Sequence, residues 1–198
     1  MIWQKLKDLF NGAEPEEPPF KQEWIELMAA NVPLYTSLTE ELREKLHLRI
    51  ARFIATTRFE GCNGLELTES MVLTVAAQAC LMVLNREGDP YPKLKAVFLY
   101  PTTFSSVQTR QDEIGVVTEG LVHRLGESWE NGTVVLAWDS VAQGARNPRD
   151  ARNVTLHEFA HQLDHENGDT DGAPSLPDHE AYRSWARVFT ENYADFLK

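Results

Sequence analysis

The feature that most constrains this chain is a pair of histidines four residues apart, in the stretch NVTLHEFAHQLDHENGD from Asn153 to Asp169. On an α-helix, His157 and His161 would lie on one face, about 6 Å apart along the axis. Both imidazoles can then bind one zinc ion at about 2.0–2.1 Å. Glu158 would lie about 100° around the helix from His157, where it can take a proton from a metal-activated water. The spacing predicts His157 and His161 as zinc ligands and Glu158 as general base.

The residues around the histidines are typical of a complete helix. Asn147 followed by Pro148 resembles a helix start, and Gly168 resembles a helix stop. An apolar face would hold the ligands rigidly against a core, and it comprises Leu156, Phe159, Ala160 and Leu163. The alternative is a surface helix with two unrelated histidines. It is disfavoured because the two residues between Glu158 and His161 are apolar.

A third zinc ligand is not evident near the pair. His165 continues the four-residue spacing, but it would lie about 12 Å from His157 along the axis, too far for the same ion. Glu180 and Glu191 fall in an expected helix over residues 179–197. Either glutamate could supply a carboxylate, and either could be an exposed helix charge.

Charge narrows the choice of partners. The 198 residues carry a formal net charge of −11, and no run of Lys or Arg is long enough to follow a phosphate backbone. Direct binding of nucleic acid is therefore not expected, because it requires a basic face. The length and the hydrophobic content of 42% predict one globular domain.

Neither a membrane span nor a disulfide framework is expected. The longest apolar stretch, Met71 to Leu84, is shorter than the roughly 20 residues that cross a bilayer, and MIWQKLKDLF at the start lacks the order of a signal peptide. Two cysteines at unrelated positions, Cys62 and Cys80, favour reduced thiols. We therefore expect a cytoplasmic protein.

The pattern along the chain predicts an α+β domain. Residues 1–19 form an N-terminal segment with the acidic, proline-rich spacer NGAEPEEPP, and the domain occupies residues 20–198. Helices are expected at 22–30, 40–56 (with Thr39 as N-cap and His47 on the exposed, charged side), 69–84 and from 148 onward. Strands are expected at 95–100, 115–118, 120–124 and 133–138. The turn signals TEG and GESWENG favour antiparallel hairpins.

Three segments resemble one family. NVTLHEFAHQLDHENGDTDGAPSLP, GESWENGTVVLAWDSVAQG and FEGCNGLELTESMVLTVAAQACLMVL are similar to the bacterial MtfA family (Mlc titration factor A), and the resemblance extends from about Leu34 to the end. It implies a cytoplasmic, zinc-dependent peptidase with one Zn²⁺ per chain. The implied fold is zincin-like, a small mostly antiparallel sheet packed by helices and preceded by N-terminal helices, with a metal site related to that of anthrax lethal factor. It implies that His157 and His161 bind zinc and that Glu158 is the general base.

The family also implies a third ligand. It uses a glutamate in an Asp-Pro-x-Glu-like motif on a later helix, and no such motif follows His161 before the chain stops at ENYADFLK. We therefore expect the peptidase domain to be truncated at its C-terminus, with the third ligand beyond Lys198. The activity of this chain would depend on that ligand.

Two functions follow from the resemblance. The first is hydrolysis of a peptide or protein substrate, which would lie extended along a sheet edge, for which Thr133–Trp138 is the candidate. The alternative is a regulatory binding protein that sequesters a transcriptional repressor and uses the peptidase-like fold as a scaffold. The family is named for binding a glucose-responsive repressor.

Overall fold

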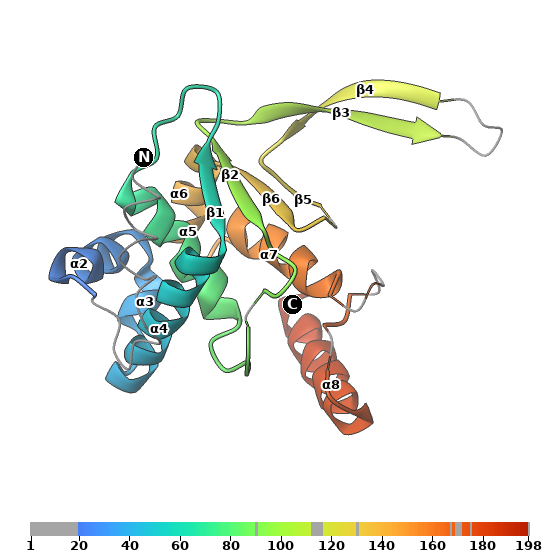
Figure 1. Ribbon diagram of the computed structural model, residues 1–198. Helices are drawn as coiled ribbons and strands as arrows, with labels where there is room; N and C mark the ends of the chain where they lie inside the picture. Colours follow the sequence, from blue (N-terminus) through green and yellow to red (C-terminus); the bar gives the residue numbers. More distant parts are fainter. Residues whose placement is uncertain are drawn as a thin grey trace. The chain divides into compact units, whose positions relative to one another are not determined.

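A computed structural model describes residues 20–89, 91–111, 117–129, 131–166, 168, 172–174 and 176–197, with the backbone alone for 104–111, 117–124 and 196. The chain forms two compact units, which divide between Gln162 and Leu163. Figure 1 labels the helices and strands along the chain. The expected segment 1–19 lies outside the described residues, so the boundary at residue 20 stays a prediction.

Of the four N-terminal helices that the structure describes, three lie close to the expected ranges, and the short one at Pro33–Thr36 was not expected. They are α2 (Gln22–Asn31), α3 (Pro33–Thr36), α4 (Glu40–Thr56) and α5 (Glu69–Met82). The Thr39 hydroxyl accepts the Leu42 N–H at 3.5 Å, and the Thr68 hydroxyl accepts the Met71 N–H at 3.2 Å, so α4 and α5 each begin at a side-chain cap. Every residue of α5 from Val72 to Cys80 is buried. This makes α5 the central helix, as its apolar sequence predicts.

The main sheet is mixed and has the order β1-β2-β6-β5. Its strands are β1 (Arg58–Gly61), β2 (Ala96–Tyr100), β5 (Gly126–Trp129) and β6 (Thr133–Ala137). β1, β2 and β6 are parallel, and only β5 is antiparallel to its neighbour. The expectation of a mostly antiparallel sheet is therefore wrong here. The chain returns from β1 to β2 through α5, and such a crossover aligns two strands in parallel.

The prediction of an edge at Thr133–Trp138 is also wrong. β6 lies between β2 and β5, which pairs with it in antiparallel register. GESWENG was expected as a turn, but its first four residues form β5. The edges of this sheet are β1 and β5. FEGCNG, which has the glycines of a turn, contains most of β1.

A second, two-stranded sheet pairs β3 (Phe104–Gln111) with β4 (Val117–Arg124) in antiparallel register, from Phe104↔Arg124 to Gln111↔Val117. The TEG signal at 118–120 is not a turn, since it lies within β4. Residues 115 and 116 of the strand expected at 115–118 lie outside the described residues. β3 was not expected at all, because FSSVQTRQ is largely polar.

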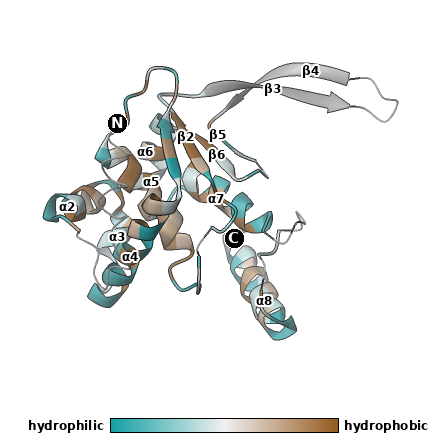
Figure 2. Cartoon of the chain, viewed as in Figure 1, coloured by the Kyte–Doolittle hydropathy of each residue, from teal (hydrophilic) through white to brown (hydrophobic). Residues whose placement is uncertain are grey.

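The core of the first unit lies where α4 and α5 meet and along the central strands. Figure 2 shows hydrophobic residues gathered on α5 and the sheet. Fully buried side chains include Trp24, Phe53, Leu73 and Leu99. His47 is half-buried, where exposure was expected. Its ring stacks on Phe20 at 4.2 Å between centroids, and its Nε2 lies 2.9 Å from the Tyr35 hydroxyl.

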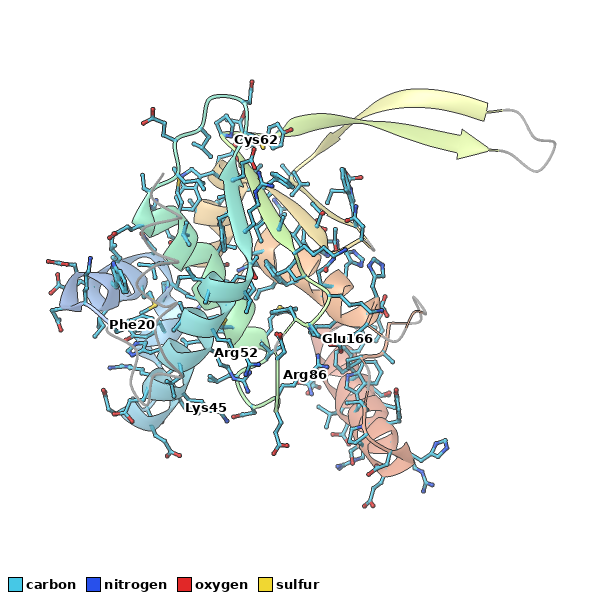
Figure 3. All side chains as sticks on the ribbon, viewed as in Figure 1. Phe20, Lys45, Arg52, Cys62, Arg86 and Glu166 are labelled. Atoms are coloured by element: carbon cyan, nitrogen blue, oxygen red, sulfur yellow. The ribbon has the colours of Figure 1, made fainter. Side chains whose placement is uncertain are left out.

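Both cysteines are free thiols. Cys80 is buried in α5, and burial raises the pKa of its thiol. Cys62 follows β1 at one end of the sheet (Figure 3). Among the helices of the described residues, none is long and apolar enough to cross a membrane.

The second unit contains α8 (His179–Phe196), close to the predicted range. The Asp178 carboxylate accepts the Ala181 N–H at 2.8 Å and caps the helix. Trp185 and Phe189 stack at 4.3 Å on its surface. None of the side chains described in α8 is buried.

Candidate metal centre

The helix that carries the two histidines, α7 (Val154–Asp164), begins later than expected. The Asn153 side chain, not that of Asn147, caps it by accepting the Leu156 N–H at 3.0 Å. Asn147 instead accepts the Arg149 N–H at 3.2 Å. This local turn competes with a helix over residues 147–150.

Asn153 also fixes the start of α7 against two other helices. Its Nδ2 donates to Gln78 Oε1 in α5 at 2.7 Å and to the Gly144 carbonyl at 3.2 Å. Gly144 belongs to α6 (Trp138–Arg146), and a Cβ there would lie 2.8 Å from the Arg152 carbonyl oxygen. The site helix therefore begins at a position set by α5 and α6.

The buried face of α7 differs from the predicted one. It comprises Thr155, Glu158, Phe159 and Gln162, whereas Ala160 is exposed and Leu156 and Leu163 are half-buried. Phe159 is the single apolar anchor on that face. It has no exposed surface, and its ring centroid lies 5.0 Å from that of Tyr91 and 5.8 Å from that of Phe53.

Glu158 and Gln162 of this face lie against β5. Gln162 Nε2 donates to Ser128 Oγ at 2.6 Å and to the Trp129 carbonyl at 3.1 Å. A Cβ on Gly126 would lie 2.6 Å from atoms of both Glu158 and Val154. A glycine is therefore required where the strand passes Glu158.

The predicted ligands and base come together on this helix. His157 and His161 are exposed, and their Nε2 atoms lie 3.3 Å apart with the rings nearly perpendicular at 85°. Two nitrogens on one tetrahedral zinc at 2.0–2.1 Å must be about 3.3–3.4 Å apart. Glu158 lies beside them and is only 6% exposed. The donor set and its spacing fit a zinc ion.

The structure does not supply the third ligand. Within the described residues, no group of three or more His, Cys, Asp or Glu side chains could hold a metal. His165 lies one residue past α7, and Glu180 and Glu191 are exposed residues of α8. A glutamate beyond Lys198 stays a prediction.

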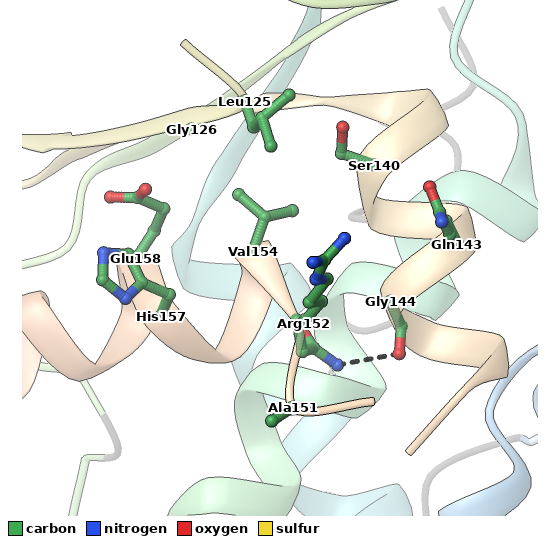
Figure 4. A pocket seen from close by; sticks show the side chains of 11 residues that line it. Leu125, Gly126, Ser140, Gln143, Gly144, Ala151, Arg152, Val154, His157 and Glu158 are labelled. Carbon is green, nitrogen blue, oxygen red and sulfur yellow. Dashed lines mark hydrogen bonds between the residues drawn. The ribbon is translucent and has the colours of Figure 1, made fainter. Parts of the chain in front are cut away.

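A cavity of about 580 Å³ opens beside His157 and Glu158 (Figure 4). It lies between β5, α6, α7 and the loop before α7. Its lining residues are Leu125, Gly126, Ser140, Gln143, Gly144, Ala151, Arg152, Asn153, Val154, His157 and Glu158. Of these, sequence reasoning identified only His157 and Glu158. Asn153 could have been found as a capping residue directly before an apolar helix, but Gly126 and Arg152 carry no local signal.

Comparison with known proteins also points to a metallopeptidase family. A family model described as "Glucose-regulated metallo-peptidase M90" matches residues 7–198. "Mlc titration factor A" of Escherichia coli O1:K1 / APEC is 33% identical over 152 residues, covering 75% of this chain and 56% of that protein. The protein of the same name from Klebsiella pneumoniae is 33% identical over 168 residues, covering 83% and 61%.

A cyanobacterial relative is also similar. "Uncharacterized protein slr2042" of Synechocystis sp. is 36% identical over 180 residues, covering 90% of this chain and 66% of that protein. The chain thus spans between 56% and 66% of the length of these three relatives.

Proposed function

The chain belongs to the M90 family of metallopeptidases, and from this premise we propose that it hydrolyses peptide bonds with a zinc ion held by His157 and His161. The observation that carries the proposal is the 3.3 Å between the two Nε2 atoms, which suits one tetrahedral zinc. When bound, zinc polarises the scissile carbonyl and brings the pKa of a water near neutrality.

Glu158 is the general base in this proposal. Its carboxylate accepts a proton from the attacking water and passes it to the departing amine. Burial between α7 and β5 supports the role, because Glu158 is only 6% exposed and Gly126 leaves room for its side chain. The lost solvation also strengthens its interaction with charge that develops nearby.

The edge strand β5 would bind the substrate. The Ala137 N–H donates to the Leu125 carbonyl at 2.8 Å, which fixes the phase of the antiparallel ladder between β5 and β6. Because hydrogen-bonded pairs alternate along such a ladder, Gly126 and Ser128 direct their backbone N–H and C=O groups away from β6. A peptide can add a strand there, next to Glu158.

The third ligand remains part of the proposal. We expect a glutamate beyond Lys198, with Glu180 and Glu191 as the in-chain alternatives. Changing Glu180 or Glu191 to Gln separates the cases, since zinc content falls only if the changed residue is the ligand.

Glu158→Gln tests the function. It keeps the shape of the side chain and removes the base, so kcat/KM for a peptide should fall by at least about 100-fold with zinc content unchanged. Glu41→Gln, at an exposed position of α4, is the matched control and should keep activity within about twofold. Equal cleavage by parent and Glu158→Gln would remove the site assignment.

The alternative is a regulatory binding protein that sequesters a transcriptional repressor. The name of the relatives, Mlc titration factor A, favours it. If the zinc-loaded parent cleaves no peptide in a diverse library but binds a repressor, and Glu158→Gln binds it equally well, the alternative replaces the peptidase.

A further inference from the structure

The cavity beside Glu158 is lined by a positively charged side chain, that of Arg152, as well as by the proposed catalytic residues. His157 and Glu158 line one part of it, and Arg152 lines another. Its volume of about 580 Å³ is within the roughly 300–1,000 Å³ of ligand pockets. A substrate held at Glu158 would therefore extend a neighbouring side chain toward Arg152.

Arg152 is available to a ligand. Its side chain is exposed, and within the described residues no ion pair or hydrogen bond engages its guanidinium. The carboxylate of Asp150, in the same loop, already has two hydrogen-bond donors. Its Oδ1 accepts a hydrogen bond from the Arg152 backbone N–H at 3.0 Å, and its Oδ2 accepts one from Asn147 Nδ2 at 2.9 Å.

Arg152 lines the cavity directly after a residue with a strained backbone conformation. Ala151, directly before it, has φ of 56°, in the left-handed region that an alanine rarely adopts. Figure 4 shows the Arg152 side chain extending between Val154 and Gln143. Strain of this kind is commonly retained where a side chain must be presented to a ligand.

The walls around Arg152 suit a short acidic side chain. Leu125 and Val154 provide apolar surface for methylene groups, and the exposed Gln143 amide adds a hydrogen-bond donor. A guanidinium binds a carboxylate through two parallel hydrogen bonds and repels a lysine.

We propose that this cavity selects substrates with a carboxylate on the residue that follows the scissile bond, and that Arg152 binds that carboxylate. The proposal rests on the proposed peptidase function. The position follows from β5: the cavity contacts Leu125 and Gly126 at the start of the strand. A peptide antiparallel to β5 has its C-terminal part at that end.

The test uses two fluorogenic peptides that differ only in Glu or Gln after the scissile bond, with the cleavage position verified by mass spectrometry. The zinc-loaded protein should cleave the Glu peptide with about tenfold higher kcat/KM, which corresponds to 1.4 kcal/mol. Added salt should reduce this preference, because the ion pair is exposed. Arg152→Ala should lower kcat/KM for the Glu peptide more than for the Gln peptide, so that the ratio of the two falls to about one. Arg149→Ala, in the same loop but outside the cavity, should keep the preference.

Charge reversal gives an independent arm. Arg152→Glu should prefer a Lys peptide over the Glu peptide, an outcome that general damage to the fold would not produce. Equal cleavage of Glu and Gln peptides by the parent, or an undiminished preference in Arg152→Ala, would overturn the proposal and leave the peptidase function intact.

Binding separates the two failures. Fluorescence anisotropy with the Glu158→Gln protein measures the affinities of both peptides without cleavage. If the Glu peptide binds about tenfold more tightly, Arg152→Ala removes this difference and the parent hydrolyses neither peptide, the pocket assignment is supported and the peptidase function is wrong. Two further peptides end at the Gln that follows the scissile bond, one with a free C-terminal carboxylate and one with a C-terminal amide. Their affinities show whether Arg152 also binds a terminal carboxylate. If neither carboxylate improves binding, the pocket assignment is wrong.

Discussion

α7 and α8 are similar helices with different surroundings. Both carry histidine and glutamate, and both begin at a side-chain cap, Asn153 for α7 and Asp178 for α8. α7 buries four side chains, whereas none of those described in α8 is buried and its Phe189 is 58% exposed. The rotation and start of α7 are therefore fixed by its contacts with neighbouring elements.

The difference shows that histidine spacing alone does not form a metal site, and that the helix must also be held in place by its neighbours. Four-residue spacing places two imidazoles on one side of any helix. In α7, the contacts of Asn153, Phe159 and Gln162 also fix where that side lies relative to β5 and Glu158. The carboxylates of Glu180 and Glu191 in α8 are exposed, and none of the side chains described in this helix is buried.

The largest expected effect separates the two helices by their aromatic residues. Phe159→Ala leaves a cavity between Tyr91 and Phe53 and should lower the free energy of unfolding by about 3–5 kcal/mol. Phe189→Ala should lower it by no more than about 0.5 kcal/mol, because the ring is already exposed. Urea unfolding measures both, and equal losses would contradict the comparison.

A smaller effect is expected at the caps. Asn153→Ala removes the cap and the bonds to Gln78 and Gly144, and should cost about 2 kcal/mol. Asp178→Ala removes one cap bond and should cost about 1 kcal/mol or less. Hydrogen exchange should show loosening of α7 in the first variant and of α8 alone in the second. Loosening of α7 by Asp178→Ala would show that the helices are not independent.

The smallest effect concerns pH. Burial lowers the pKa of His47. The Glu40 carboxylate raises this pKa and the Arg43 guanidinium lowers it, both by less than burial does. The unfolded chain therefore takes up this proton first, and stability present above about pH 6.5 declines as the pH falls. His47→Gln should flatten that decline between pH 7.5 and 5.5. His179→Gln, at an exposed residue of α8, is the control. An identical pH profile for parent and His47→Gln would refute the assignment.

Local signals predicted the helices better than the sheet. α4 begins and ends where its cap and apolar spacing indicate, and α8 agrees within one residue. β1 was missed because its four residues include a glycine and its partner β2 lies more than thirty positions away. Parallel pairing depends on such distant partners, which a local pattern cannot identify.

The site was predictable in part for the same reason. Spacing identified His157, Glu158 and His161, which the structure places together. The buried face was misassigned because hydrophobicity alone chose Leu156 and Ala160 over Thr155 and Gln162. The hydrogen bond of Gln162 to Ser128 in β5 explains why that amide turns inward. Gly126 and Arg152 reach the site through tertiary packing, which leaves no periodicity to detect.

Zinc binding by histidine variants tests the central claim most directly. Titration of the metal-free protein should show one zinc ion per chain. His157→Ala and His161→Ala should each weaken its affinity by more than the roughly 10–100-fold that loss of a residue supporting a ligand costs. His179→Ala, on α8, should leave it unchanged. If both α7 variants bind zinc as tightly as the parent, His157 and His161 do not form the metal centre.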